Sequence, residues 1–145
     1  MAFNPDILVT EPGSADVLLI VEAKTTSTWS QSEPKLKQYM WEMSCPVGLF
    51  ASPRTIVLYR NRFTGYSDDS VQKLGEYPSP RSWITFEKQT SGAEFETRVQ
   101  SWLERLRIDF GTEEVPRETK DALSEYVLPS LIRGEVHAAG PRIAT

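Results

Sequence analysis

The sequence contains a single cysteine, Cys45, and a single histidine, His137. One cysteine excludes an internal disulfide and a multi-cysteine metal site, and a histidine without a second ligand of its kind argues against zinc. The chain also contains no glycine-rich phosphate-binding loop and no serine or cysteine triad. Apolar neighbours predict that the Cys45 thiol is packed rather than reactive. The sequence therefore argues against a zinc site and against catalysis by a serine or cysteine triad.

Long apolar runs are absent as well. No stretch approaches the roughly 20 apolar residues of a membrane-spanning helix. The first residues, Met-Ala-Phe-Asn-Pro-Asp, lack the basic start and apolar core of a signal peptide. We therefore expect a cytoplasmic protein without membrane contact. The 145 residues, of which 39% are hydrophobic and 25% charged, predict one globular domain over residues 1–145.

Net positive charge is lacking too, because the formal net charge is -4. This value argues against a protein that coats nucleic acid through a generally basic surface. The charge is unevenly distributed, however, with six basic and two acidic residues from Lys24 to Arg62, against seven basic and ten acidic residues from Gln89 onward. A basic first half is expected where a phosphate backbone approaches. For each of these residues alone, a solvated surface charge is the alternative interpretation.

The most informative stretch runs from Asn4 to Lys24. Residues 7–10 predict a short strand, the Pro-Gly pair within residues 11–14 predicts a tight turn, and residues 16–24 predict a second strand. Val17 to Val21 contains no polar residue, which is typical of a central strand covered on both faces. The stretch therefore predicts a β-hairpin at the centre of a sheet.

Three charged residues lie where this predicted hairpin begins and ends. Glu22 and Lys24 point to the same side of the sheet because side chains alternate along a strand. Strand pairing brings Asp6 alongside them. Charges at the end of a buried strand are costly unless something there uses them. Two carboxylates with a nearby backbone oxygen suit a hard cation such as Mg²⁺, and a lysine beside it can hold or help deprotonate a water.

This pattern resembles the PD-(D/E)xK nuclease superfamily. Pro5-Asp6 is followed, sixteen residues after the aspartate, by Glu22-Ala23-Lys24. Residues 33–40, Glu-Pro-Lys-Leu-Lys-Gln-Tyr-Met, look like the helix after the motif strand, and residues 46–59 look like the next hairpin. The nearest likeness is to the N-terminal nuclease domain of type I restriction enzyme motor subunits, over about the first sixty residues. The resemblance implies an α/β (α+β) fold with a restriction-endonuclease-like mixed sheet flanked by helices.

The resemblance also implies a metal-dependent deoxyribonuclease, an endonuclease rather than an exonuclease. Asp6, Glu22 and the carbonyl of Ala23 would hold Mg²⁺ or its substitute Mn²⁺, and Lys24 would orient the attacking water. The partner would be DNA, within a homodimer or a larger restriction or repair assembly. The residues expected to bind the substrate strand are Lys35, Gln38, Tyr39, Arg54 and Arg60.

The helix expected after the motif strand departs from the family pattern. Related nucleases often carry Gln-x-x-x-Tyr at this place, whereas this chain has Lys35 four residues before Tyr39, and Gln38 directly before it. Ser32 can cap this helix and Pro34 fits its first turn, which predicts a helix over residues 33–43. For Tyr39, a structural role and a role in substrate binding both stay open.

The motif-bearing core is expected to cover residues 1–60, with further strands at 47–51 and 55–60. Residues 61–80, rich in turn-forming residues, predict an irregular excursion, and residues 81–86 a short extended segment. A helical part is expected over residues 92–133, with helices at 93–108 and at about 116–131. Residues 134–145, which are poor in apolar side chains and include His137, predict a flexible tail.

Two alternatives to an active nuclease follow from the sequence. Many members of the superfamily place a further acidic residue on a helix before the Pro-Asp pair, but only four residues precede Pro5. The chain is then a fragment, or the acid comes from another chain or a later helix, or the site works without it. The first alternative is an inactive module that binds nucleic acid or protein on the same fold. The second is an exposed salt-bridge cluster of Asp6, Glu22 and Lys24 in an unrelated α/β protein.

Overall fold

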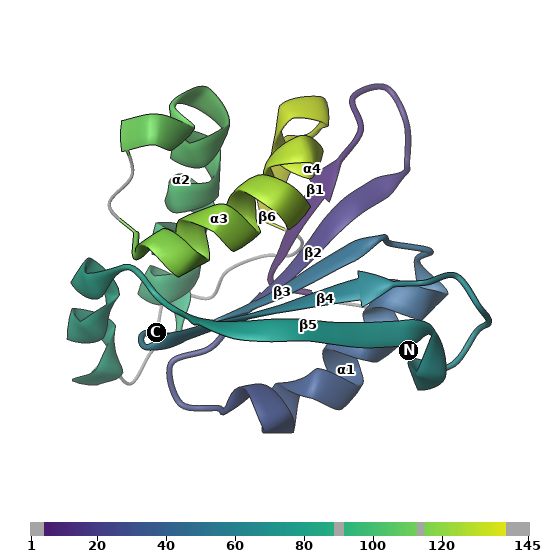
Figure 1. Cartoon of the computed structure of the whole chain (residues 1–145), viewed down its shortest axis with the longest axis horizontal. Helices are drawn as coiled ribbons and strands as arrows, with labels where there is room; N and C mark the ends of the chain where they lie inside the picture. The colour runs from purple at the N-terminus through teal and green to yellow at the C-terminus, as the bar shows by residue number, and fades with distance from the viewer. Residues whose placement is uncertain (1–4, 89–91, 113–114, 139–145) are drawn as a thin grey trace.

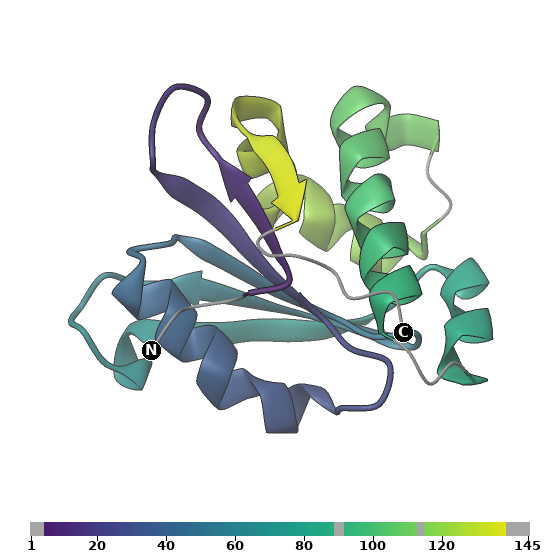
Figure 2. The same cartoon turned by 180° about the vertical axis from the view of Figure 1, so that it is seen from behind.

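A computed structural model of the chain describes residues 5–88, 92–112 and 115–138. Six strands form one mixed sheet in the order β5-β4-β3-β2-β1-β6. Helix α1 covers one face of this sheet, and α2, α3 and α4 cover the other (Figures 1 and 2). The strands are β1 (Ile7–Thr10), β2 (Val17–Ala23), β3 (Val47–Ala51), β4 (Thr55–Asn61), β5 (Val71–Pro78) and β6 (Glu135–Ala138). The predicted α/β class, with a mixed sheet flanked by helices, is confirmed.

The helices of the described residues differ in length and type. The α-helices are α1 (Trp29–Glu42), α2 (Ala93–Ile108), α3 (Arg117–Tyr126) and α4 (Leu128–Arg133). Three 3-10 segments are η1 (Asp68–Ser70), η2 (Arg81–Lys88) and η3 (Phe110–Thr112). Within the ranges that the structure describes, every helix is too short or too polar to cross a membrane.

Strand pairing brings several chain segments to one end of the sheet. β1 runs antiparallel to β2, with Ile7 opposite Val21, while β2 and β3 are parallel and end together at Ala23 and Ala51. β4 returns antiparallel to β3, so that it begins where β3 ends. The start of β1, the ends of β2 and β3 and the start of β4 therefore share one edge, which we call the site end.

The alternation of side chains divides the core into two layers. Ile20, Val57 and Tyr59 pack with Leu36 and Met40 beneath α1. On the other face the sheet packs against the apolar stripe of α2 and against α3 and α4. The residues of that stripe are Phe95, Val99, Trp102, Leu103 and Leu106. Burying both faces explains why Val17 to Val21 carries no polar residue.

The expectation of a flexible tail from Gly134 is wrong for residues 135–138, which form β6 and extend the sheet antiparallel to β1. Gly134 makes this possible, because a Cβ at this position would lie 2.4 Å from Val9 Cγ1 and 2.9 Å from the Ser130 carbonyl oxygen. His137 is exposed on β6, with Nε2 2.9 Å from Thr10 Oγ1. Residues 139–145, the rest of the expected tail, lie outside the described residues.

Two further expectations on residues 61–86 are corrected. The excursion at 61–80 contains η1 and the eight-residue strand β5, which pairs with β4. Leu74 and Tyr77 of β5 pack against the core, although turn-forming residues surround them. The extended segment expected at 81–86 is the 3-10 helix η2. Its Trp83 is buried edge-on against Phe95 and Trp102, at ring-centroid distances of 5.4 and 4.9 Å.

The boundaries of two helices also differ from those that the sequence predicts. α1 begins at Trp29 rather than Glu33, because Thr28 forms a capping box with Gln31. The expected helix at 116–131 is divided into α3 and α4, and Pro129 lies in the first turn of the second. Cys45 is buried, as its apolar neighbours predicted.

Candidate active site at the end of the sheet

Asp6, Glu22 and Lys24 meet at the site end. The Lys24 ammonium lies 3.0 Å from Asp6 Oδ2 and 3.5 Å from Glu22 Oε2. The residues come from opposite ends of the hairpin in sequence, and strand pairing brings them together. The second alternative from the sequence, an exposed salt-bridge cluster, would be favoured by carboxylates that lie far apart, whereas here both lie beside one ammonium group and Glu22 is buried.

Backbone groups fix the two carboxylates. The Asp6 amide donates to Glu22 Oε1 at 3.2 Å, and the Ala23 amide donates to Asp6 Oδ2 at 2.9 Å. Asp6 is the residue before the Ile7–Val21 pair, so these reciprocal bonds continue the β1–β2 ladder through side chains. Both carboxylates are therefore held in place by the strands rather than by flexible loops.

Burial and charge shift the pKa of the acidic group at the centre of this cluster. Glu22 is only 2% exposed. Its burial, followed by the nearby charge of Asp6, raises the pKa of Glu22 to about 7, against the opposing effect of Lys24. The carboxyl group can therefore gain or lose a proton near neutral pH.

For the pKa of Lys24, nearby charges outweigh the effect of burial. Burial disfavours its charged form, but the negative charges of Asp6 and Glu22 outweigh burial and raise the pKa of Lys24. The ammonium therefore stays protonated at neutral pH and can donate hydrogen bonds to an anion. Its side chain is 35% exposed, so a substrate can reach it.

A third carboxylate acts on this cluster from the other face of the sheet. Glu96 lies in the first turn of α2, and its charge is a smaller contribution to the raised pKa of Lys24. α2 packs against β2, and its first turn lies at the site end (Figure 2). Only the tertiary packing of α2 on the sheet could reveal the proximity of Glu96 to Lys24.

The donor set fits a hard divalent cation. Mg²⁺ is usually bound by one or two carboxylates, with water and substrate phosphate completing the coordination. Asp6 and Glu22 supply two buried or half-buried carboxylates at one point, and the Ala23 backbone is bonded directly to one of them. Over residues 5–88, 92–112 and 115–138, no group of three or more His, Cys, Asp or Glu side chains has the spacing of a protein-only metal cage.

The residues expected to bind substrate do not all lie at the site end. Lys35 and Gln38 are exposed on α1, and Gln38 donates to Glu42 within the same helix at 2.9 Å. Tyr39 is 5% exposed within the core beneath α1, so its ring is not on the surface where a DNA strand would bind. The Lys35–Tyr39 pair therefore does not present a common face to substrate.

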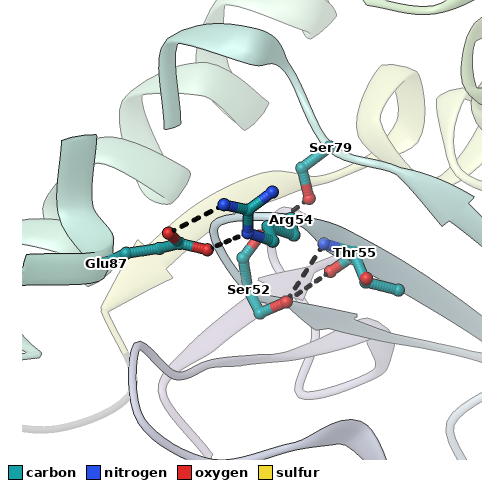
Figure 3. A network of polar contacts seen from close by, with 5 residues as sticks. All are labelled: Ser52, Arg54, Thr55, Ser79 and Glu87. Atoms are coloured by element: carbon teal, nitrogen blue, oxygen red, sulfur yellow. Dashed lines mark hydrogen bonds and ion pairs between the residues drawn. The ribbon is translucent and has the colours of Figure 1, made fainter. Parts of the chain in front are cut away.

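The two arginines expected to bind substrate lie at opposite ends of β4. Arg60 pairs with Val47, where β3 begins, and its Nη2 lies 3.2 Å from Gln72 Oε1, away from the site end. Arg54 lies in the β3–β4 turn at the site end, where its guanidinium binds both oxygens of Glu87 (Figure 3). Glu87 was not anticipated, because η2 was not expected to fold back onto this turn.

No family model matches the chain, and neither a curated protein nor a solved structure matches it. The structure therefore defines a mixed α/β protein with a carboxylate–lysine cluster at the end of its central hairpin. Membership of the PD-(D/E)xK superfamily, and the restriction-endonuclease-like subtype of this fold, stay predictions from the residues.

Proposed function

We propose that the protein is a metal-dependent nuclease that hydrolyses DNA phosphodiester bonds at the Asp6–Glu22–Lys24 cluster, acting as an endonuclease in the cytoplasm. The observation that carries the proposal is the convergence of two carboxylates on one ammonium at a strand end. Asp6 and Glu22 would hold Mg²⁺, with the Ala23 backbone carbonyl as a further ligand. When bound, the cation supplies positive charge to the phosphate and lowers the pKa of a water molecule.

The side chains of the cluster have separate roles in this proposal. Lys24 stays charged, because its two acidic neighbours raise its pKa. It can therefore orient a water for attack and then stabilise the negative charge that develops on the phosphate oxygens. Glu22 binds a cation only after losing its proton, so the pKa of about 7 ties metal binding to pH.

The direct test is incubation of the purified chain with supercoiled plasmid and with single-stranded DNA, with and without Mn²⁺ or Mg²⁺. We expect metal-dependent cleavage that Glu22→Gln and Lys24→Ala each abolish. Lys37→Ala is the matched control, because Lys37 forms an ion pair with Glu33 on α1 rather than with the cluster. Cleavage that survives both cluster substitutions would refute this assignment.

A second candidate is a non-catalytic module that binds nucleic acid or protein. Two observations favour it: Lys24 neutralises the same carboxylates that a cation would need, and the net charge is -4. Calorimetric titration with Mn²⁺ separates the two candidates. A nuclease binds the ion and loses this binding in Glu22→Gln, whereas a module of this kind has no reason to bind it.

A further inference from the structure

A cleft adjoins the carboxylate–lysine cluster at the site end. Its volume is ≈ 440 Å³, and it lies between the loop that follows β2 and the β3–β4 turn. The cleft begins at Thr25, directly after Lys24, and the Lys24 amide donates to the Ala51 carbonyl at 2.9 Å. The next residue, Ser52, lines the opposite wall. The cleft therefore starts directly beyond the Lys24–Ala51 backbone pair at the site end.

The walls of the cleft combine hydroxyl groups with the apolar side chains of Trp29, Phe50 and Pro53. Two charged side chains line it, Arg54 and Glu87, and the hydroxyl-bearing lining residues are Thr25, Thr26, Ser27, Thr28, Ser30, Ser52 and Thr55. The Ser52 hydroxyl bonds within the β3–β4 turn, and the Thr28 and Ser30 hydroxyls bond each other at the start of α1. The hydroxyls of the other lining residues can donate to phosphate oxygens and accept from a sugar hydroxyl without adding charge. Such lining is typical of contacts that position a nucleic-acid backbone without reading its bases.

The turn that carries Arg54 is held firmly. Ser52 Oγ accepts from the Thr55 amide at 3.1 Å and donates to the Thr55 carbonyl at 2.9 Å. Ser79 bonds both sides of the turn, through its amide to the Arg54 carbonyl at 3.0 Å and through its hydroxyl to the Ser52 carbonyl at 2.7 Å (Figure 3). These bonds fix the backbone of Arg54, while its side chain extends into solvent.

The Arg54 side chain is 67% exposed and the Glu87 side chain 34% exposed. The two groups form a bidentate pair at the mouth of the cleft. Because water reaches both side chains, this pair contributes only modestly to stability even with its bidentate geometry. The guanidinium fork fits a phosphate as well as it fits a carboxylate. A phosphate can therefore replace Glu87 on Arg54 at small cost.

We propose that this cleft is a backbone subsite for the DNA strand beside the bond to be cleaved, and that Glu87 occupies Arg54 until a phosphate displaces it. Glu87 thereby acts as a built-in competitor that weakens binding of polyanions at the site end. The inference depends on the proposed nuclease function, because it places the substrate strand next to Lys24.

The test is the affinity for a fluorescein-labelled 20-nucleotide single-stranded DNA, measured by anisotropy in Ca²⁺. We expect Glu87→Gln to bind about fivefold more tightly than the wild-type chain, because it frees the Arg54 fork. Arg54→Ala should bind more weakly, and the double variant Arg54→Ala with Glu87→Gln should bind as Arg54→Ala does. The absence of a gain in the double variant shows that Glu87 acts through Arg54.

Glu11→Gln is the matched control. Glu11 pairs with Arg133 at 3.3 Å, with side chains 38% and 61% exposed, and lies beyond the other end of β1. It therefore changes the net charge by the same amount in a similar ion pair away from the cleft. Equal affinities for Glu87→Gln and Glu11→Gln would overturn the subsite. So would a double variant that binds as tightly as Glu87→Gln.

Cleavage by the wild-type chain separates the two proposals. Mn²⁺-dependent cleavage together with equal affinities of Glu87→Gln and Glu11→Gln overturns the subsite and leaves the nuclease proposal standing. If the wild-type chain neither cleaves nor binds the oligonucleotide, both proposals fall. A lower melting temperature of Glu87→Gln with unchanged DNA affinity identifies the Arg54–Glu87 pair as a brace between the turn and η2, and this result also overturns the subsite.

Discussion

At the scale of single residues, Glu22 links the stability of the fold to pH. Its pKa is about 7 in the folded protein against 4.5 as its ordinary value, so the folded state holds the proton more tightly than the unfolded state does. The stability that this proton provides is fully present below about pH 4.5. It is lost as the pH rises to about 7.

Glu22→Gln should remove this pH dependence, because the amide is similar in shape to the protonated acid. We expect the variant to gain stability relative to the wild-type chain as the pH rises from 4.5 to 7, by a difference on the order of 3 kcal/mol. Urea unfolding at half-unit pH steps measures it. Glu11→Gln, in an exposed ion pair, is the control. A constant difference between Glu22→Gln and the wild-type chain over this range would contradict the pKa of Glu22.

Lys24→Ala tests the charge balance of the same cluster from the other side. Without the ammonium, Asp6 and Glu22 face each other uncompensated, so we expect a loss of about 1–2 kcal/mol at pH 8, a value reduced because Lys24 is partly exposed. The loss should shrink at pH 5, where Glu22 is protonated.

Added Mn²⁺ should restore part of the stability lost at pH 8, because the cation replaces the missing positive charge. Thermal melts of Lys24→Ala with and without Mn²⁺ measure this restoration. Lys37→Ala should show no such response to the ion. A Lys24→Ala melt that Mn²⁺ does not change would argue that the cluster does not bind the cation.

At the scale of secondary-structure elements, the sequence predicted what local patterns determine. The uninterrupted Val17–Val21 segment, the Pro-Gly turn and the alternation of Asp6, Glu22 and Lys24 relative to the apolar residues predicted the hairpin and its cluster. These features depend on residues close in sequence or on simple strand pairing. The cluster at the site end was therefore predictable to the residue.

The elements that sequence reasoning missed depend on contacts between distant segments. β6 contains one partly buried apolar residue, Val136, and becomes a strand only because β1 offers an unpaired edge. η2 is positioned by Trp83, whose partners lie on α2. The positions of Glu87 and Glu96 depend on how η2 and α2 pack in the fold. Neither residue could therefore be assigned to the site end from local patterns.

Gly134→Ala tests how β6 docks. The added Cβ would lie 2.9 Å from the Ser130 carbonyl and 3.1 Å from the Thr10 carbonyl, and backbone atoms cannot move aside cheaply. We expect a loss of about 1–3 kcal/mol and faster amide exchange in β6 and in its partner β1. Gly65→Ala is the control, because nothing lies within 4 Å of its added Cβ. Equal stability of the two variants would mean that β6 adapts without cost.

At the scale of the whole molecule, the distribution of charge limits how DNA can bind. The net charge is -4, so attraction to DNA depends on local cations rather than on the overall field. Lys24 and Arg54 lie at the site end, whereas Arg60 lies at the other end of β4, beside the start of β3. The length of β4 thus separates basic residues that appear as one group in the sequence.

This separation predicts how affinity responds to salt. Each phosphate contact on a single strand contributes about -0.7 to the slope of log affinity against log salt concentration. If DNA binds at the site end, Arg54→Ala should make the slope shallower by about that amount, whereas Arg60→Ala should leave it unchanged. Titration of the labelled oligonucleotide in Ca²⁺ at several salt concentrations measures both slopes. A shallower slope in Arg60→Ala alone would place the strand across the opposite end of the sheet, where the carboxylate–lysine cluster could not act on it.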